Sequence, residues 1–376
     1  MKYIKGLDTL RAFAVLFVMI EHKGVWFDDT VPNGRFIKEV IIPDGGFGVF
    51  LFFVLSGFLI TGILLKERDE HEVVTQVVVG KFFMRRALRI FPIYFLLLSF
   101  LYAINYTGIR DIFFYHLTYT TNILCYRTNQ WNSFSHVWTL CVEEQFYLFW
   151  PWLIIFISRK YLKYVFLLSI LTGIVSTWYC MDIKGHMGPL LVFNCCDSFG
   201  IGGLLAYSQL NEKYRVGFQQ WLKWAGGFAL AIYLYWKIGA FMRVTTYGFI
   251  FSKTITSVLA AWLISLVVNA GPSFFRRHFL ENRLLTFVGR ISYGIYLYHY
   301  VYNALVYCQL NDFLSKITTG FPSLNLLVND SHFFYWLHIA LVIALSACSY
   351  YIIERPFLKL KRFFGNKEEA VVKHLG

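Results

Sequence analysis

Long apolar segments recur along the whole chain and constrain its fold more than any other feature. About 17–25 consecutive apolar residues are enough for one helix to cross the hydrocarbon core of a bilayer. The composition agrees, because 57% of the 376 residues are hydrophobic and only 15% are charged. The sequence therefore predicts an all-α, polytopic membrane helix bundle. About ten transmembrane helices are expected, at residues 7–26, 46–65, 90–106, 143–157, 164–181, 189–208, 222–240, 247–268, 286–307 and 333–353.

The distribution of positive charge predicts the orientation of this bundle. Most of the 35 Lys and Arg residues lie in the two termini and in the connections that would share a side with them. Cytoplasmic loops collect such residues, so both termini are expected in the cytoplasm. The +13 net charge is then explained by the membrane surface rather than by nucleic acid. We interpret residues 1–360 as one transmembrane domain, 361–376 as a short cytoplasmic tail, and the short segment 112–126 as interfacial or re-entrant.

Two ionisable residues, Arg11 and His22, lie inside the first apolar segment. Charged groups at such depth are costly, and they usually line a polar cavity or take part in chemistry. Eleven residues are close to three helical turns, so both side chains share one face, about 16 Å apart along the axis. That face is expected to line a polar space. The alternatives are an ion pair between Arg11 and Asp8, three residues earlier, and a backbone carbonyl that satisfies His22.

Other titratable residues are expected at the depth of His22. His299 falls in the outer half of the ninth segment, Glu143 and Glu144 at the outer start of the fourth, and Asp197 inside the sixth. One outer layer would thus hold five titratable groups from four helices. Each also has a structural interpretation. The two glutamates could complement a helix macrodipole, and Asp197 could pair with a nearby lysine or arginine.

Polar and aromatic residues accompany this outer layer. A polar stripe at helical spacing in the ninth segment is formed by Ser292, Tyr296, His299 and Asn303. Such a stripe either faces a site or hydrogen-bonds neighbouring helices together. Aromatic side chains near the outer ends, Trp138 among them, could stack on sugar rings, although aromatic belts at the membrane interface are common.

A basic cluster precedes the third segment. Lys81, Arg85, Arg86 and Arg89 lie close together there, and Arg11 enters the membrane near the same side. Such a cluster either anchors anionic lipid or binds a phosphorylated ligand. The seven cysteines lack metal-ligand spacing, so no metal is expected. A cationic inner mouth below an outer chamber suits a ligand with phosphates at one end and a reactive group at the other, such as acyl-coenzyme A.

Seven motifs in order resemble the acyltransferase-3 family of integral membrane proteins. They are GLDTLRAFAVLFVMIEH (6–22), FGVFLFFVLSGFLITGILL (47–65), RRALRIFPIYF (85–95), HVWTLCVEEQFYLFWP (136–151), DSFGIGGLLA (197–206), GRISYGIYLYH (289–299) and YYIIERPF (350–357). The resemblance covers essentially the whole chain. It implies a ten-span protein of the bacterial inner membrane that transfers an acyl group, usually acetyl, from cytoplasmic acyl-CoA to an extracytoplasmic carbohydrate or glycolipid. Some relatives append an SGNH hydrolase-like domain, and none is expected here.

The resemblance also implies site residues. Arg11 and His22 match the Arg-x10-His pair of the family, with His22 essential, and the basic run at 85–89 matches its proposed coenzyme A site. We expect His22 to be the general base, Glu143 to orient it, and His299 or a backbone donor to steady the oxyanion. The residues expected to bind CoA are Arg11, Arg85, Arg86 and Arg89, and those expected near the acceptor are Glu144, Asp197, Trp138 and Tyr296.

Three further questions stay open at this level. The transfer could be direct, or Ser56 or His22 could carry the acyl group transiently. A proton-coupled glycolipid carrier or flippase would also use protonatable groups within the membrane. A structural subunit of an export complex would tolerate changes at Arg11 and His22. The acceptor glycan, the acyl chain and the oligomeric state are not determined by the sequence.

Overall fold

The computed structural model describes residues 3–23, 42–70, 75–132, 134–238, 246–302 and 331–364, together with 305–306, 309–310, 312–313 and 316. Within these residues the fold consists of helices and short turns, without strands. The long helices are α1 (Lys5–Lys23), α3 (Gly45–Glu70), α4 (Thr75–Ala103), α7 (Trp138–Phe156), α8 (Leu162–Lys184), α10 (Glu212–Ile238), α11 (Thr246–Val268) and α16 (Ser331–Ser349). Shorter helices are α9 (Cys196–Gln209), α12 (Arg283–Arg290) and α13 (Ser292–Tyr302).

The predicted all-helical membrane class is confirmed for the described residues. Five of their helical stretches are long and apolar enough to cross a bilayer, namely Gly45–Asp69, Val77–Ala103, Arg159–Lys184, Phe251–Val268 and Trp336–Phe364. The expected number of ten spans and the cytoplasmic placement of both termini stay predictions. Parts of the expected elements, including residues 24–26, Asn303 and 365–376, lie outside the described residues.

Several helices begin at positions other than those expected from hydropathy. Helix α4 begins at Thr75 rather than at 90, so the basic run belongs to the helix itself. Helix α7 begins at Trp138 rather than at 143, which places Glu143 more than one turn inside it. Hydropathy misses these first turns because polar residues interrupt the apolar run while the backbone stays helical.

Two expected segments are interrupted or fragmented. The ninth is divided at Ile291 into α12 and α13. Segment 112–126 folds as short pieces: the end of a 3-10 helix (Tyr106–Ile112), α5 (Phe113–Leu117) and α6 (Thr121–Thr128). None of these pieces is long enough to span a bilayer, which agrees with the expectation that this segment does not cross the membrane.

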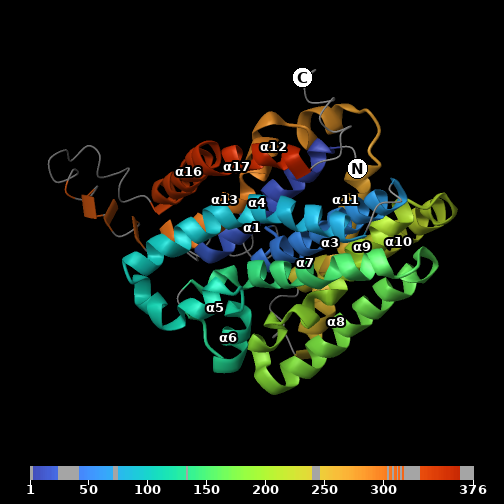
Figure 1. Cartoon of the computed structure of the whole chain (residues 1–376), viewed down its shortest axis with the longest axis horizontal. Helices are drawn as coiled ribbons and strands as arrows, with labels where there is room; N and C mark the ends of the chain where they lie inside the picture. Colours follow the sequence, from blue (N-terminus) through green and yellow to red (C-terminus); the bar gives the residue numbers. More distant parts are fainter. Residues whose placement is uncertain are drawn as a thin grey trace.

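Helix α3 lies at the centre of the bundle, in contact with α1, α7, α9 and α11 (Figure 1). It is apolar on all sides, as expected for a helix surrounded by others. The Asp44 carboxylate accepts a hydrogen bond from the Phe47 amide at 2.7 Å and so caps its N-terminus. Glycines allow close approach to α9: a Cβ at Gly202 would lie 2.2 Å from the Val54 carbonyl oxygen. Small residues commonly bring membrane helices together in this way.

Alanine is expected to have opposite effects at two glycines. Gly202→Ala forces α3 and α9 apart, so we expect a loss of about 1–3 kcal/mol or more in stability. At Gly217 on α10 a Cβ would meet no atom within 4 Å, so Gly217→Ala should gain up to about 1 kcal/mol from helix propensity. Thermal unfolding of the purified variants in one detergent measures both. Equal effects at the two positions would contradict the proposed close packing.

Candidate active site

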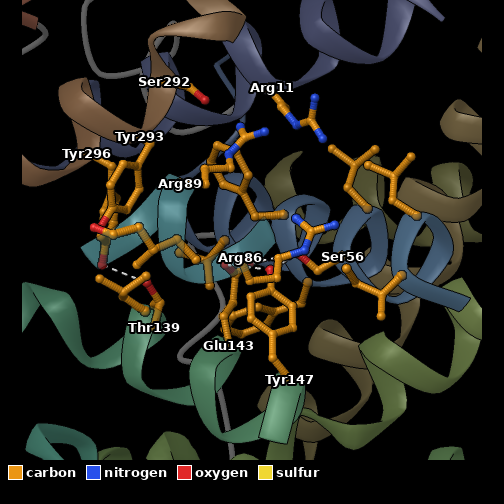
Figure 2. Close-up of a pocket in the computed structure, with 18 of the residues that line it drawn as sticks. Arg11, Ser56, Arg86, Arg89, Thr139, Glu143, Tyr147, Ser292, Tyr293 and Tyr296 are labelled. Atoms are coloured by element: carbon orange, nitrogen blue, oxygen red, sulfur yellow. Dashed lines mark hydrogen bonds between the residues drawn. The ribbon is translucent and has the colours of Figure 1, made fainter. Parts of the chain in front are cut away.

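A cavity of about 110 Å³ lies between five helices. Residues from α1, α3, α4, α7 and α13 converge on it, and Figure 2 shows these side chains around a common space. The polar lining residues are Arg11, Ser56, Arg86, Arg89, Thr139, Glu143, Tyr147, Ser292, Tyr293 and Tyr296. The remaining wall is apolar and comes mainly from α3. The cavity therefore combines three positive charges, one carboxylate and an apolar surface.

Three guanidinium groups face this cavity from two helices (Figure 2). Arg11 is held by Asp8, with 2.6 Å between its Nη1 and the carboxylate Oδ1. Arg86 lies over the Tyr147 ring, 5.5 Å from its centroid, and Arg89 completes the group. Three arginines can neutralise several negative charges, so this end of the cavity suits a polyanion.

Arg85 is directed elsewhere. It forms an ion pair with Glu67 and donates to the Phe364 carbonyl oxygen at 3.1 Å, and it is absent from the cavity wall. Residues three and four apart share a helix face, so Arg89 is a neighbour of both Arg85 and Arg86 on α4. Arg86 and Arg89 line the cavity, whereas the contacts of Arg85 direct it to the helix ends beside α4. Of the four arginines expected to bind CoA, three line the cavity.

A serine, a glutamate and a tyrosine form a hydrogen-bonded group on the cavity wall. The Ser56 hydroxyl donates to Glu143 Oε1 at 2.9 Å and lies 3.2 Å from the Tyr147 hydroxyl. Tyr147 donates to Glu143 Oε2 at 3.3 Å. Glu143 thus bonds Ser56 and Tyr147, not an imidazole as expected. Tyr147 was not among the site residues predicted from the sequence. Its spacing of four residues from Glu143 nevertheless places both on one face of α7.

His22 and His299 form a hydrogen-bonded pair. His22 Nδ1 lies 2.9 Å from His299 Nε2, and His299 Nδ1 lies 2.7 Å from the Tyr296 carbonyl oxygen. A carbonyl only accepts, so His299 must carry its proton on Nδ1 and accept at Nε2. His22 then donates from Nδ1, which leaves its Nε2 as the basic nitrogen. His299, rather than Glu143, therefore sets the tautomer of His22.

A third histidine, His136, joins this pair. Its ring centroid lies 5.2 Å from that of His299, and it stacks on Tyr300 with 5.0 Å between centroids. His136 is buried. The only sequence signal for it was its place at the start of the HVWTLCVEEQFY motif. Each of the three histidines lies about one turn from a cavity-lining residue, in the pairs His22 with Val18, His136 with Thr139, and His299 with Tyr296.

These spacings give the cavity two different ends. On α1 and α13 the histidine follows the lining residue, whereas just before α7, whose Thr139 hydroxyl lies 2.6 Å from that of Tyr296, the histidine precedes it. The imidazoles therefore gather beyond one end of the cavity. Arg11 lies seven residues before Val18 on α1, towards the other end. Arg11 and the histidines therefore lie towards opposite ends of the cavity.

The remaining expected residues divide between this cavity and the protein core. Tyr296 lines the cavity, and its hydroxyl lies 2.6 Å from that of Thr139. Trp138 packs edge-on against Phe53, with ring centroids 6.4 Å apart, and lies outside the lining set. Glu144, next to Glu143, also lies outside it, and its buried Oε1 has no hydrogen-bond partner among the described residues.

Asp197 belongs to a buried ion pair. It lies in the first turn of α9, with Oδ1 3.1 Å from Lys253 Nζ on α11, and its other oxygen accepts from Thr254 at 2.9 Å. Asp197 and Lys253 are 0% and 1% exposed. Lys253 also donates to Thr177 on α8 at 2.8 Å. The pair therefore joins three helices, and the structural interpretation of Asp197 is the one that the geometry favours.

Breaking this pair on one side is expected to destabilise the bundle. Asp197→Leu or Lys253→Met leaves a buried charge without its partner, which costs about 3–5 kcal/mol. The double variant removes both charges and should recover most of that loss. Thermal unfolding of the three purified variants measures the difference. Single variants that unfold like the wild type but bind an acceptor weakly would instead favour the substrate-binding role expected from the sequence.

The fold and this cavity define a helical membrane protein with a charged site inside its bundle, and the comparisons assign its family. The family model of the acyltransferase-3 type, described as an acyltransferase domain, matches residues 4–355. The chain therefore belongs to the acyltransferase-3 family. Within the described residues, no group of three or more His, Cys, Asp or Glu side chains could hold a metal ion.

Curated relatives carry O-acetyltransferase names. The chain is 26% identical over 96% of its length to "Putative O-acetyltransferase SACOL0978" of Staphylococcus aureus (strain COL), of which it covers 58%. It is 25% identical over 80% of its length to "O-acetyltransferase OatA" of Staphylococcus aureus (strain NCTC 8325 / PS 47), of which it covers 50%. The chain thus spans about half the length of these relatives. No solved structure matches it significantly.

Proposed function

We propose that the protein is a membrane O-acyltransferase that moves an acyl group, in the first instance acetyl, from cytoplasmic acyl-CoA to a hydroxyl of an extracytoplasmic carbohydrate or glycolipid. The observation that carries this proposal is the cavity with three guanidinium groups at one end and an imidazole pair beyond the other. Family membership and the O-acetyltransferase names of the relatives support it.

The donor binds from the arginine end. Arg11, Arg86 and Arg89 hold the phosphates of CoA, because a polyanion cannot enter the hydrocarbon region. The pantetheine arm extends along the apolar wall and brings the thioester towards the histidines. In the topology of ten spans with both termini inside, the arginine end is cytoplasmic. We assign residues 1–360 to this transmembrane domain in the inner membrane.

The acceptor binds at the histidine end. His22 Nε2 removes the proton of the acceptor hydroxyl, and His299 fixes the ring by accepting from Nδ1. An imidazole suits this role because it exchanges protons near neutral pH. Direct transfer forms an ester C–O bond and breaks the thioester C–S bond. The proton taken up by His22 finally neutralises the departing thiolate, so the site returns to its starting state.

Transfer by purified protein in lipid nanodiscs tests this function. With isotopically labelled acetyl-CoA and a glycan extract from the cell envelope, we expect free CoA to appear together with labelled, alkali-sensitive ester on the glycan. Mass spectrometry of surface glycans from a deletion strain and its parent should identify the same ester. A protein that moves a glycolipid across the bilayer without releasing CoA would refute the proposal in favour of a carrier.

A further inference from the structure

We propose that Ser56 is a nucleophile that carries the acyl group as an ester between donor and acceptor. This inference rests on the proposed function. It concerns a step that acyl transfer does not require, because a direct attack by the acceptor would give the same product. The assignment comes from the surroundings of Ser56 within the cavity.

The hydrogen bonding of Ser56 differs from that of two other serines inside helices, Ser257 and Ser346. Ser257 and Ser346 donate to the carbonyl oxygen four residues earlier, at 2.9 and 2.7 Å, which is the usual arrangement for a hydroxyl inside a helix. The Ser56 hydroxyl instead donates across to Glu143 on α7, at 2.9 Å. Its oxygen lines the cavity between the two helices (Figure 2).

Ser56, Glu143 and Tyr147 have the arrangement of an activated nucleophile. Such a group needs a base within hydrogen-bond reach and a third residue that orients the base. Glu143 is within reach of the Ser56 hydroxyl, and Tyr147 donates to its second oxygen at 3.3 Å. Arg86 lies over the Tyr147 ring, 5.5 Å from its centroid, so positive charge is available where negative charge develops on a thioester oxygen.

The position of the second base supports a reaction in two steps. His22 does not line the cavity, and it lies one turn beyond the lining residue Val18 on α1. The four residues from Val18 to His22 correspond to about 6 Å along the helix axis. A base at the donor cavity and another base beyond it suit two half-reactions, one with CoA and one with the acceptor. A single direct transfer would leave the Ser56–Glu143 pair without a chemical role.

In the first half-reaction, Ser56 Oγ attacks the thioester carbonyl carbon while Glu143 takes the hydroxyl proton. The new C–O ester bond forms, the C–S bond breaks, and the thiolate leaves as free CoA with the proton from Glu143. In the second, the oxygen of the acceptor hydroxyl attacks the ester carbonyl, and its proton passes along the cavity to His22, which lies beyond the other end. The bond to Ser56 Oγ breaks and the serine oxygen recovers a proton, so no redox partner is needed.

The ester can be trapped and located by mass spectrometry. His22→Ala protein, incubated with labelled acetyl-CoA without acceptor, should release CoA in a burst stoichiometric with the protein. The peptide that contains Ser56 should then carry one acetyl group that hydroxylamine removes. Ser56→Ala should lose both the label and at least about 10³-fold in transfer to glycan. Ser56→Cys should retain a labelled peptide, now as a thioester, because the nucleophile is kept.

A matched control is Ser169→Ala, which removes a helical hydroxyl that bonds the Cys196 carbonyl oxygen away from the cavity. It should label and transfer like the wild type. Wild-type transfer by Ser56→Ala, or no label on Ser56 in protein that transfers acetyl groups, would overturn this inference and leave the proposed function standing. Absence of CoA release from the wild type with glycan present would instead overturn the function itself.

Discussion

His22→Gln protein should transfer about 10²–10⁴-fold less acetyl to glycan than the wild type, the usual contribution of a general base. His22 Nδ1 is occupied by His299 at 2.9 Å, so Nε2 is the nitrogen left to accept the acceptor proton. Glutamine keeps a polar side chain of similar length but has no basic nitrogen. The measurement is labelled ester on glycan per unit of purified protein, with saturating acetyl-CoA.

Two readouts separate a catalytic role of His22 from a structural one. Binding of CoA should be unchanged in His22→Gln, because His22 lies beyond the cavity that holds the donor. The control His278→Gln removes an exposed histidine in the π-helical turn Arg276–Leu280, away from the cavity, where its ring lies 3.1 Å from the Phe274 carbonyl oxygen. It should retain full activity. Wild-type transfer by His22→Gln would remove His22 from the mechanism.

Arg86→Gln and Arg89→Gln should each weaken donor binding about 10- to 100-fold. Hydrogen bonds to charged groups contribute about 1.5–3 kcal/mol each, and every 1.4 kcal/mol or so is tenfold in affinity. Both residues line the cavity. The measurement is the KM for acetyl-CoA, together with CoA binding by calorimetry. The kcat for transfer should change less than KM in Arg89→Gln, whereas Arg86→Gln should lower kcat as well, because Arg86 lies over the ring of Tyr147, which bonds Ser56 and Glu143.

Arg85→Gln provides the contrast within the same helix. This arginine pairs with Glu67 and bonds the Phe364 carbonyl. Its loss should lower the unfolding temperature, since Glu67 is left partly buried without its partner, while the KM for acetyl-CoA stays near the wild-type value. An equal rise in KM for all three variants would instead favour a diffuse basic surface, such as a lipid anchor.

Side-chain contacts, and not position along the helix, decide which basic residues of α4 line the cavity. The cluster in α4 was evident from composition, but its members were treated as one group. Arg89 lies three residues after Arg86 and four after Arg85, so the helical period alone places all three near one face of α4. The contacts of Arg85 with Glu67 and Phe364 separate it from the cavity, and these contacts come from tertiary packing.

The expected depth of a residue in the membrane did not predict which residues form contacts. Glu143, His22, His299 and Asp197 were expected in one layer, and two of them do pair. Glu143 instead bonds Ser56, 87 residues away in sequence, and Asp197 pairs with Lys253. Position along a helix follows from counting residues, whereas lateral neighbours depend on how the helices pack. No feature of the sequence linked Lys253 to Asp197 or His136 to His299.

The amino-acid sequence by itself determined that this chain is helical, that several helices suit a bilayer, and that Arg11 and His22 share one face of the first. These properties depend on local composition and on the 3.6-residue period of the helix. Only the tertiary structure decided that Ser56 and Glu143 share a wall with the arginines, and that His299 orients His22. Such contacts come from the packing of separate helices around α3, whose crossing points are set by close approaches such as Gly202 to Val54 and not by any local period.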